Sequence, residues 1–190
     1  IQAIVNTMGV SVSAAFAVVN RIDDFAYTPE QNIAHAMTAL MAQNKGAGKI
    51  DRMKEGFRSG IILEIIYGIL IFIICFVFAR PLMLMFVKDE EVIGHGVTYL
   101  HLISVMYLLP ALTNGIQGFF RGIGDLKITL ISSFINMALR VLAAAPLVLI
   151  WKIGIEALPY SYLAGWIGML VAETPLLLKT YKTWGKKAGQ

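Results

Sequence analysis

The sequence has 190 residues, of which 57% are apolar and 15% are charged, and its formal net charge is +4. A soluble domain of this length could not bury so many apolar residues, so we expect an integral membrane protein. The basic residues lie between apolar runs rather than on one face, which argues against a nucleic-acid partner and favours a lipid bilayer. The one cysteine, Cys75, rules out a disulfide framework or a thiolate metal site built from this chain.

The start of the sequence indicates a fragment. Segment 1–5 is already apolar, with no basic region before it and no small-residue cleavage site after it. A signal peptide has both features, so we interpret this segment as the tail of an earlier helix. We therefore expect 1–190 to be part of a longer protein.

Most of the chain consists of apolar runs of about 20 residues, which are long enough to cross a bilayer as helices. A more polar segment near the start is added as a further span because its polar residues recur at helical spacing. The predicted fold is all-α and membrane-embedded, with five transmembrane helices. The predicted spans are 12–42, 59–79, 97–119, 128–150 and 157–178.

The distribution of Lys and Arg predicts the orientation of these spans. Segments 43–58, 120–127 and 179–190 hold eleven of these residues, whereas the alternate connecting segments hold three. Loops rich in Lys and Arg stay on the cytoplasmic side. We therefore expect a multi-pass protein of the cell membrane whose C-terminus is cytoplasmic.

The first predicted span is amphipathic. At about 100° per residue, its polar residues fall on one arc of a helix and most of its apolar residues on the other. The polar stripe consists of Asn20, Arg21, Asp24, Thr28, Gln31, Asn32, His35 and Thr38. Arg21 and Asp24 are three residues apart and can form an ion pair. Asp23 and Glu30 fall outside the stripe, and Pro29 predicts a bend or a hinge.

Three interpretations of this stripe remain open. Polar side chains in a membrane are costly unless they pair or face water, so the stripe can line a cavity touched by substrate or coupling ion. It can instead join helices without any role in transport. A third alternative is an interfacial helix that does not cross the membrane.

Two stretches resemble one known family. Residues 5–60, with the element AQNKGAGKIDR, resemble the second helix and following cytoplasmic loop of one half of a multidrug and toxin extrusion (MATE) transporter. Residues 117–141 resemble the junction of the fourth and fifth helices, including the element RGIGD. In these loops Gly46, Gly48, Gly122 and Gly124 suit turns, and Asp51 and Asp125 are expected to cap the helices that follow.

The resemblance implies helices eight to twelve of a twelve-helix fold, so the chain would be one incomplete six-helix lobe. The first lobe and most of helix seven would be missing. It also implies exchange of drugs or organic cations for Na⁺ or H⁺ by alternating access of two lobes. No cofactor is expected besides the coupling ion, and the expected partners are the substrate, the bilayer and the missing lobe.

Several family members carry a carboxylate on the fourth helix of this lobe, but residues 108–122 offer only Asn114 and Gln117 there. This departure argues against binding of the coupling ion on this helix and leaves the missing first lobe as its alternative location. Arg140 is expected to meet a carboxylate or backbone carbonyls, with Asp24 and Glu173 as candidates. Glu64 is placed near a helix end, within reach of the membrane interface. The candidate pathway residues are Asn20, Arg21, Asp24, Gln31, His35, Asn114, Gln117, Asn136, Arg140 and Glu173.

Other functions are weighed against export. A lipid-linked saccharide flippase of the same superfamily needs a basic cavity, for which Arg21 and Arg140 are the in-span cations. A structural membrane subunit without transport is a second alternative. No GxSxG or HExxH motif supports an intramembrane enzyme, His95 and His101 have too few carboxylates around them for a metal site, and the glycine-rich loops lack the phosphate-loop pattern.

Overall fold

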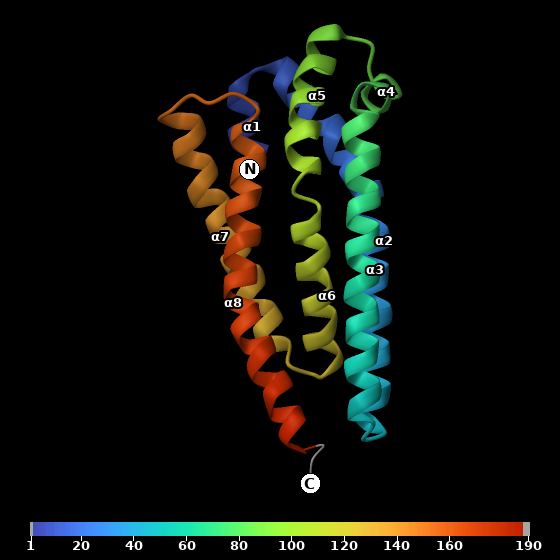
Figure 1. Ribbon diagram of the computed structural model, residues 1–190. Coiled ribbons are helices and arrows are strands. Elements are labelled where there is room, and N and C mark those ends of the chain that lie inside the picture. Colours follow the sequence, from blue (N-terminus) through green and yellow to red (C-terminus); the bar gives the residue numbers. More distant parts are fainter. Residues whose placement is uncertain (1, 188–190) are drawn as a thin grey trace.

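The computed structural model describes the backbone of residues 2–187 and the side chains of residues 2–183. The described chain is a bundle of helices without strands (Figure 1). The helices are α1 (Gln2–Val5), the short 3₁₀ helix η1 (Asn6–Met8), α2 (Val10–Gly46), α3 (Ile50–Val77), α4 (Ala79–Leu84), α5 (Glu90–Ser104), α6 (Leu108–Gly122), α7 (Leu126–Leu149) and α8 (Ala157–Lys187).

The bundle has two packed groups. Helices α2, α3, α5 and α6 pack against one another, α7 packs along α8, and α6 contacts both groups. Two apolar clusters fill the bundle. The larger contains Phe16 and Val19 of α2 together with Tyr99 and Ile103 of α5, and the smaller centres on Phe119 and Phe120 of α6.

The predicted membrane fold is confirmed. Helices α3, α7 and α8 are long and apolar enough to cross a membrane, and α5 with α6 makes a fourth span if the bent pair crosses as one. Helix α2 covers the whole predicted span 12–42 as one helix of 37 residues that includes Pro29. It is too polar to join the apolar spans, so its crossing and its hinge at Pro29 stay predictions.

The predicted span 97–119 is broken. Helices α5 and α6 meet at an angle of 51°. At the break, the amide of Met106 donates to the carbonyl of Ile103, and the amide of Leu109 donates to the carbonyl of Met106. Each bond spans three residues, as in a 3₁₀ turn, rather than the four of an α-helix. Pro110 has no N–H to bond the carbonyl four residues earlier, so a regular helix cannot continue through this point.

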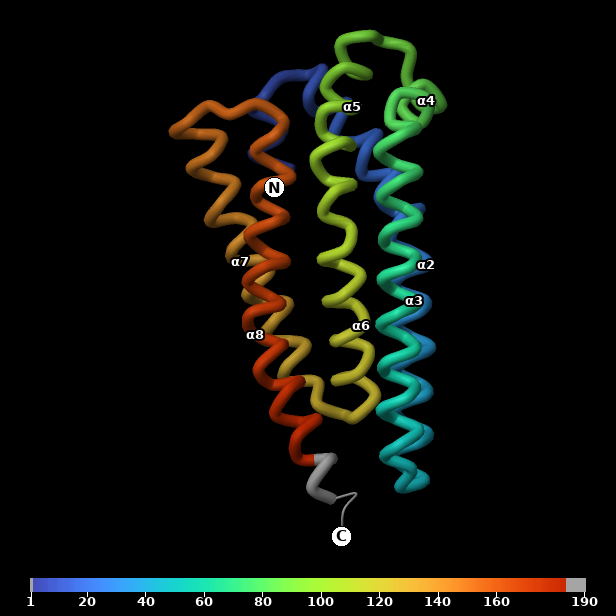
Figure 2. The backbone as a smooth tube through the Cα atoms, viewed as in Figure 1, coloured from blue at the N-terminus to red at the C-terminus, as the bar shows by residue number. Residues whose placement is uncertain are grey.

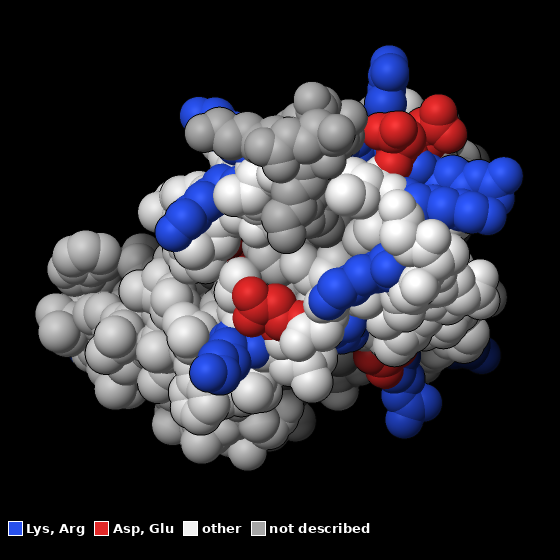
Figure 3. Space-filling view, turned by 90° about the horizontal axis from the view of Figure 1, so that it is seen from below, with Lys and Arg blue, Asp and Glu red and all other residues white. Residues whose placement is uncertain are grey.

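The turn between α2 and α3, the turn between α6 and α7, and the end of α8 lie at one end of the bundle (Figure 2). Figure 3 looks onto this end and shows Lys and Arg side chains at several places on it. The structure therefore groups the loops that the Lys and Arg count had grouped. Which side of the membrane they face stays a prediction.

The predicted turn chemistry is partly right. Gly48 and Gly124 have φ of 68° and 81°, which favour glycine. Gly46 and Gly122 are instead the last residues of α2 and α6. Lys49 precedes α3, so Asp51 is not its cap and lies 3.6 Å from the ammonium of Lys54. Asp125 occupies the capping position of α7, but its side chain makes no cap hydrogen bond.

Candidate functional site

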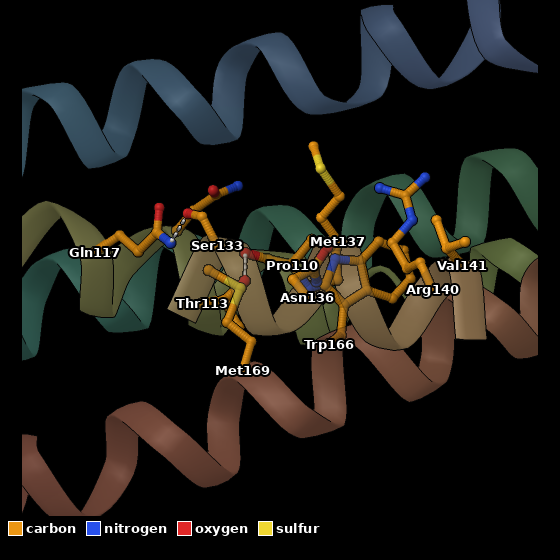
Figure 4. Close-up of a pocket in the computed structure, with 11 residues that line it drawn as sticks. Pro110, Thr113, Gln117, Ser133, Asn136, Met137, Arg140, Val141, Trp166 and Met169 are labelled. Carbon is orange, nitrogen blue, oxygen red and sulfur yellow. Dashed lines mark hydrogen bonds between the residues drawn. The ribbon is translucent and has the colours of Figure 1, made fainter. Parts of the chain in front are cut away.

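A pocket of about 570 Å³ lies between α6, α7 and α8 (Figure 4). Helix α6 contributes residues from Pro110 to Gln117, α7 those from Ser133 to Val141, and α8 two large apolar side chains. The lining residues are Pro110, Thr113, Asn114, Gln117, Ser133, Asn136, Met137, Arg140, Val141, Trp166 and Met169. The pocket thus brings together four of the ten predicted pathway residues, Asn114, Gln117, Asn136 and Arg140.

The one charged residue of this lining, Arg140, lies on an aromatic ring. Its guanidinium carbon is 3.6 Å from the centre of the Tyr162 ring, a cation–π contact. Gly165 makes room for the Arg140 side chain, because a Cβ there would lie 2.6 Å from its Cγ. Among the described residues Arg140 has no ion pair, and its Nε has no acceptor. Neither candidate carboxylate, Asp24 or Glu173, forms an ion pair with Arg140. The other expected partners, backbone carbonyls, stay a prediction.

At one end of the pocket, Gln117 connects to a buried carboxyl group. Its side-chain amide donates to Ser133 at 3.3 Å and to Oε1 of Glu173 at 3.4 Å. The hydroxyl of Ser132 also donates to Glu173, whose side chain is fully buried. The predicted pathway residue Glu173 is thus reached from the pocket through Gln117, without lining the pocket itself.

The predicted residues of α2 are elsewhere. Asn20, Arg21, Asp24, Gln31 and His35 do not line this pocket. All except the half-buried Asn20 are exposed. The structure shows no ion pair between Arg21 and Asp24. The stripe therefore forms an exposed polar face along α2, and its role in transport stays a prediction.

Sequence reasoning missed three buried acids. Asp23 is 5% exposed, and Glu30 and Glu64 are fully buried. The hydroxyl of Tyr107 donates to Asp23, whereas both carboxyl oxygens of Glu30 and of Glu64 lack a donor. Glu64 lies in the middle of α3, so its predicted position near a helix end is wrong. The helix begins at Ile50, well before the predicted start at residue 59.

A signal for two of these acids was present in the sequence. Asp23 and Glu30 are seven residues apart, which places them on the same helical face. Phe16 and Met37 extend the same seven-residue series and are also buried. The two acids therefore belong to the packed face of α2, opposite its polar stripe.

Residues 1–145 match the family model described as MatE. The chain belongs to the MatE family. The resemblance seen in the two loop elements is thereby confirmed. The chain is 30% identical over 190 residues to the probable multidrug resistance protein YoeA of Bacillus subtilis, covering 96% of this chain and 39% of that protein. It is 25% identical over 173 residues to the probable multidrug resistance protein NorM of Thermotoga maritima, covering 88% of this chain and 36% of the other.

Solved MatE structures show the same fold at low identity. A structure of MATE in the bent conformation matches with a TM-score of 0.91 at 15% identity, covering 96% of this chain and 41% of that one. An outward-facing multidrug resistance MATE transporter matches with a TM-score of 0.88 at 16% identity, covering 94% and 40%. The chain therefore spans about two fifths of the length of the MatE proteins it matches.

Proposed function

We propose that this chain supplies most of the second lobe of a MatE efflux transporter in the cell membrane, with a cytoplasmic C-terminus. The complete transporter would export drugs or organic cations in exchange for Na⁺ or H⁺, by alternating access between this lobe and a first lobe. The names of the curated relatives support export of drugs. The separation of this lobe into two helix groups with a pocket at their junction supports a transport pathway here.

The pocket between α6, α7 and α8 is the observation that carries the proposal. Small-molecule sites combine mostly apolar walls with a few placed polar groups. Here Met137, Trp166 and Met169 supply apolar surface, and the amides of Asn114 and Asn136 supply hydrogen bonds. Asn136 lies near the middle of α7, and substrate sites of secondary transporters lie near the middle of the membrane. The pocket therefore suits an amphipathic drug.

The exposed stripe of α2 supports the presence of a first lobe. Arg21, Asp24 and Gln31 are exposed on this chain, and such side chains are costly against lipid. A water-filled cavity between two lobes would satisfy them. Asp24 would then be the carboxylate of this face that attracts a cationic drug.

Arg140 favours a second candidate function. It places a positive charge in the pocket, and no described carboxylate lines the pocket or pairs with it. Such a charge attracts an anionic headgroup, which suits a lipid-linked saccharide flippase better than a transporter of cations. A structural subunit without transport is the third alternative, and it leaves the pocket without a ligand.

Transport by the complete protein in liposomes separates these functions. An ethidium-like cation and a fluorescent lipid-linked saccharide are offered in parallel, each under an imposed Na⁺ or H⁺ gradient. The proposal predicts gradient-driven flux of the cation and no flipping of the saccharide. Flipping of the saccharide alone would establish the flippase, and the absence of both activities would contradict transport.

A further inference from the structure

The register of three helices brings Glu30 and Glu64 to the same level. Helices α2 and α3 are antiparallel. The hydroxyl of Tyr67 bonds the carbonyl of Ala26 at 3.1 Å on one side of this level, and Gly60 packs against Met37 on the other. Between these two contacts, Glu30 of α2 lies opposite Glu64 of α3.

Helix α6 closes the same level. A Cβ on Gly115 would lie 3.6 Å from Cγ of Glu64, so α6 passes close to this side chain. One turn further along α6, Gly118 touches the backbone of Ala34. Asn114 lies four residues before Gly118, and Glu30 lies four residues before Ala34. Asn114 and Glu30 are therefore side by side one turn away from this contact, and the side-chain amide of Asn114 lies within reach of Glu30.

The two carboxyl groups are closed off from solvent. Both side chains are fully buried even in this lobe alone, and no described donor meets hydrogen-bond geometry at their four oxygens, the Asn114 amide being the one polar group that interacts with Glu30. The ionisable groups that interact with Glu30 are Glu64 and Tyr67 of α3 and Tyr27 of α2 itself. Helix α6 adds only the amide of Asn114, and no described Lys or Arg pairs with either acid.

Two adjacent negative charges in such surroundings are strongly unfavourable. A buried charge needs a partner or a bound ion, and two carboxylates that share a site do not both stay charged. The level lies in the middle of α3, far from both ends of an apolar span. A cation shared by the two groups would relieve their repulsion, with the amide oxygen of Asn114 available as a further ligand.

We infer that Glu30, Glu64 and Asn114 form a binding site for one monovalent cation, H⁺ or Na⁺, whose movement drives the export proposed above. This inference rests on the proposed function. Binding lowers the negative charge of the pair by one, and release restores it. The site adjoins the drug pocket through Asn114, and the pocket lining contains neither acid. Pro29, next to Glu30, removes a helical hydrogen bond and allows this part of α2 to adjust as the cation enters or leaves.

The test uses the complete transporter in liposomes, with variants Glu30→Gln and Glu64→Gln and the exposed Glu55→Gln of α3 as the matched control. Two activities are measured: drug accumulation driven by an imposed Na⁺ or H⁺ gradient, and drug exchange without any ion gradient. We expect both site variants to lose gradient-driven accumulation while they keep exchange, and the control to keep both. Retention of full gradient-driven accumulation by both site variants would overturn the cation site and leave the proposed function standing.

A chemical measurement tests the site without relying on transport. Dicyclohexylcarbodiimide modifies protonated carboxyl groups in apolar surroundings, and mass spectrometry identifies the modified residue. We expect Glu30 or Glu64 to be modified. Suppression by Na⁺ at fixed pH identifies Na⁺ as the occupant, and suppression only by raising the pH identifies H⁺. Absence of modification at every pH, together with unchanged coupling in the Gln variants, would refute the site. A wild-type protein that exports no drug but shows cation-sensitive modification would refute the proposed function alone.

Discussion

The hydroxyl of Tyr107 donates a hydrogen bond to Oδ1 of Asp23 at 2.5 Å, across 84 positions of sequence. Tyr107 lies at the break between α5 and α6, and its side chain is fully buried. The ring of Tyr27 meets it edge-on, with centroids 5.5 Å apart. The break between the two helices is therefore tied to α2 through a buried acid that lies outside the polar stripe.

Removal of this bond should destabilise the lobe. In Tyr107→Phe the carboxyl of Asp23 stays buried without its donor, which costs about 1–3 kcal/mol for an unsatisfied buried group. Thermal unfolding in detergent should show a lower midpoint, whereas the control Tyr160→Phe, at an exposed site, should not. Because the two residues form one interaction, Asp23→Leu with Tyr107→Phe should cost less than the sum of the single changes. Additive costs would show that the bond does not stabilise the protein.

Close packing of α2 on α6 depends on Gly118. A Cβ at this position would lie 2.6 Å from the carbonyl oxygen of Ala34, which is backbone and cannot rotate away. We expect Gly118→Ala to destabilise the protein by about 1–3 kcal/mol, the usual cost of overpacking. Gly94→Ala on α5 is the control, because among the described residues no atom beyond its own stretch of helix lies within 4 Å of its Cβ position. Equal unfolding midpoints for the two variants would contradict the packing.

The orientation of the bundle can be measured with single cysteines. Lys49 lies in the turn between α2 and α3, and Lys88 lies before α5 at the opposite end (Figure 1). In a Cys75→Ser background, Lys49→Cys should react in intact cells only with a membrane-permeant maleimide. Lys88→Cys should also react with an impermeant one. The reverse pattern would invert the topology predicted by the positive-inside rule.

Asp24 tests whether the stripe of α2 serves a cationic substrate. Both Asp24 and Arg21 are exposed and unpaired with each other, so Asp24→Asn should leave the amount of folded protein in the membrane unchanged. We expect it to weaken efflux of an ethidium-like cation. If Asp24→Asn instead expresses poorly, and adding Arg21→Gln restores both the amount of protein and its transport, the two residues form a structural pair in the complete transporter.

The sequence predicted the helices better than it predicted which of their polar residues are buried. Apolar length placed three of the predicted spans along α3, α7 and α8, because the lipid requirement acts on each segment separately. The predicted span 97–119 is instead broken into α5 and α6. The partners of Asp23, Glu30 and Arg140 depend on the register between helices. That register follows from contacts such as Gly118 on Ala34 and Gly60 on Met37, which no single segment reveals.

Protection of a cysteine in the pocket by drug shows most directly whether drugs pass through this pocket. Met137 is 67% exposed and lines the pocket, and Lys127, on the same helix but outside the pocket, is the control position. In the complete transporter without Cys75, the account predicts that a transported cation slows maleimide modification of Met137→Cys and leaves Lys127→Cys unaffected. Modification of Met137→Cys at the same rate with and without saturating drug would contradict a drug pathway through this pocket.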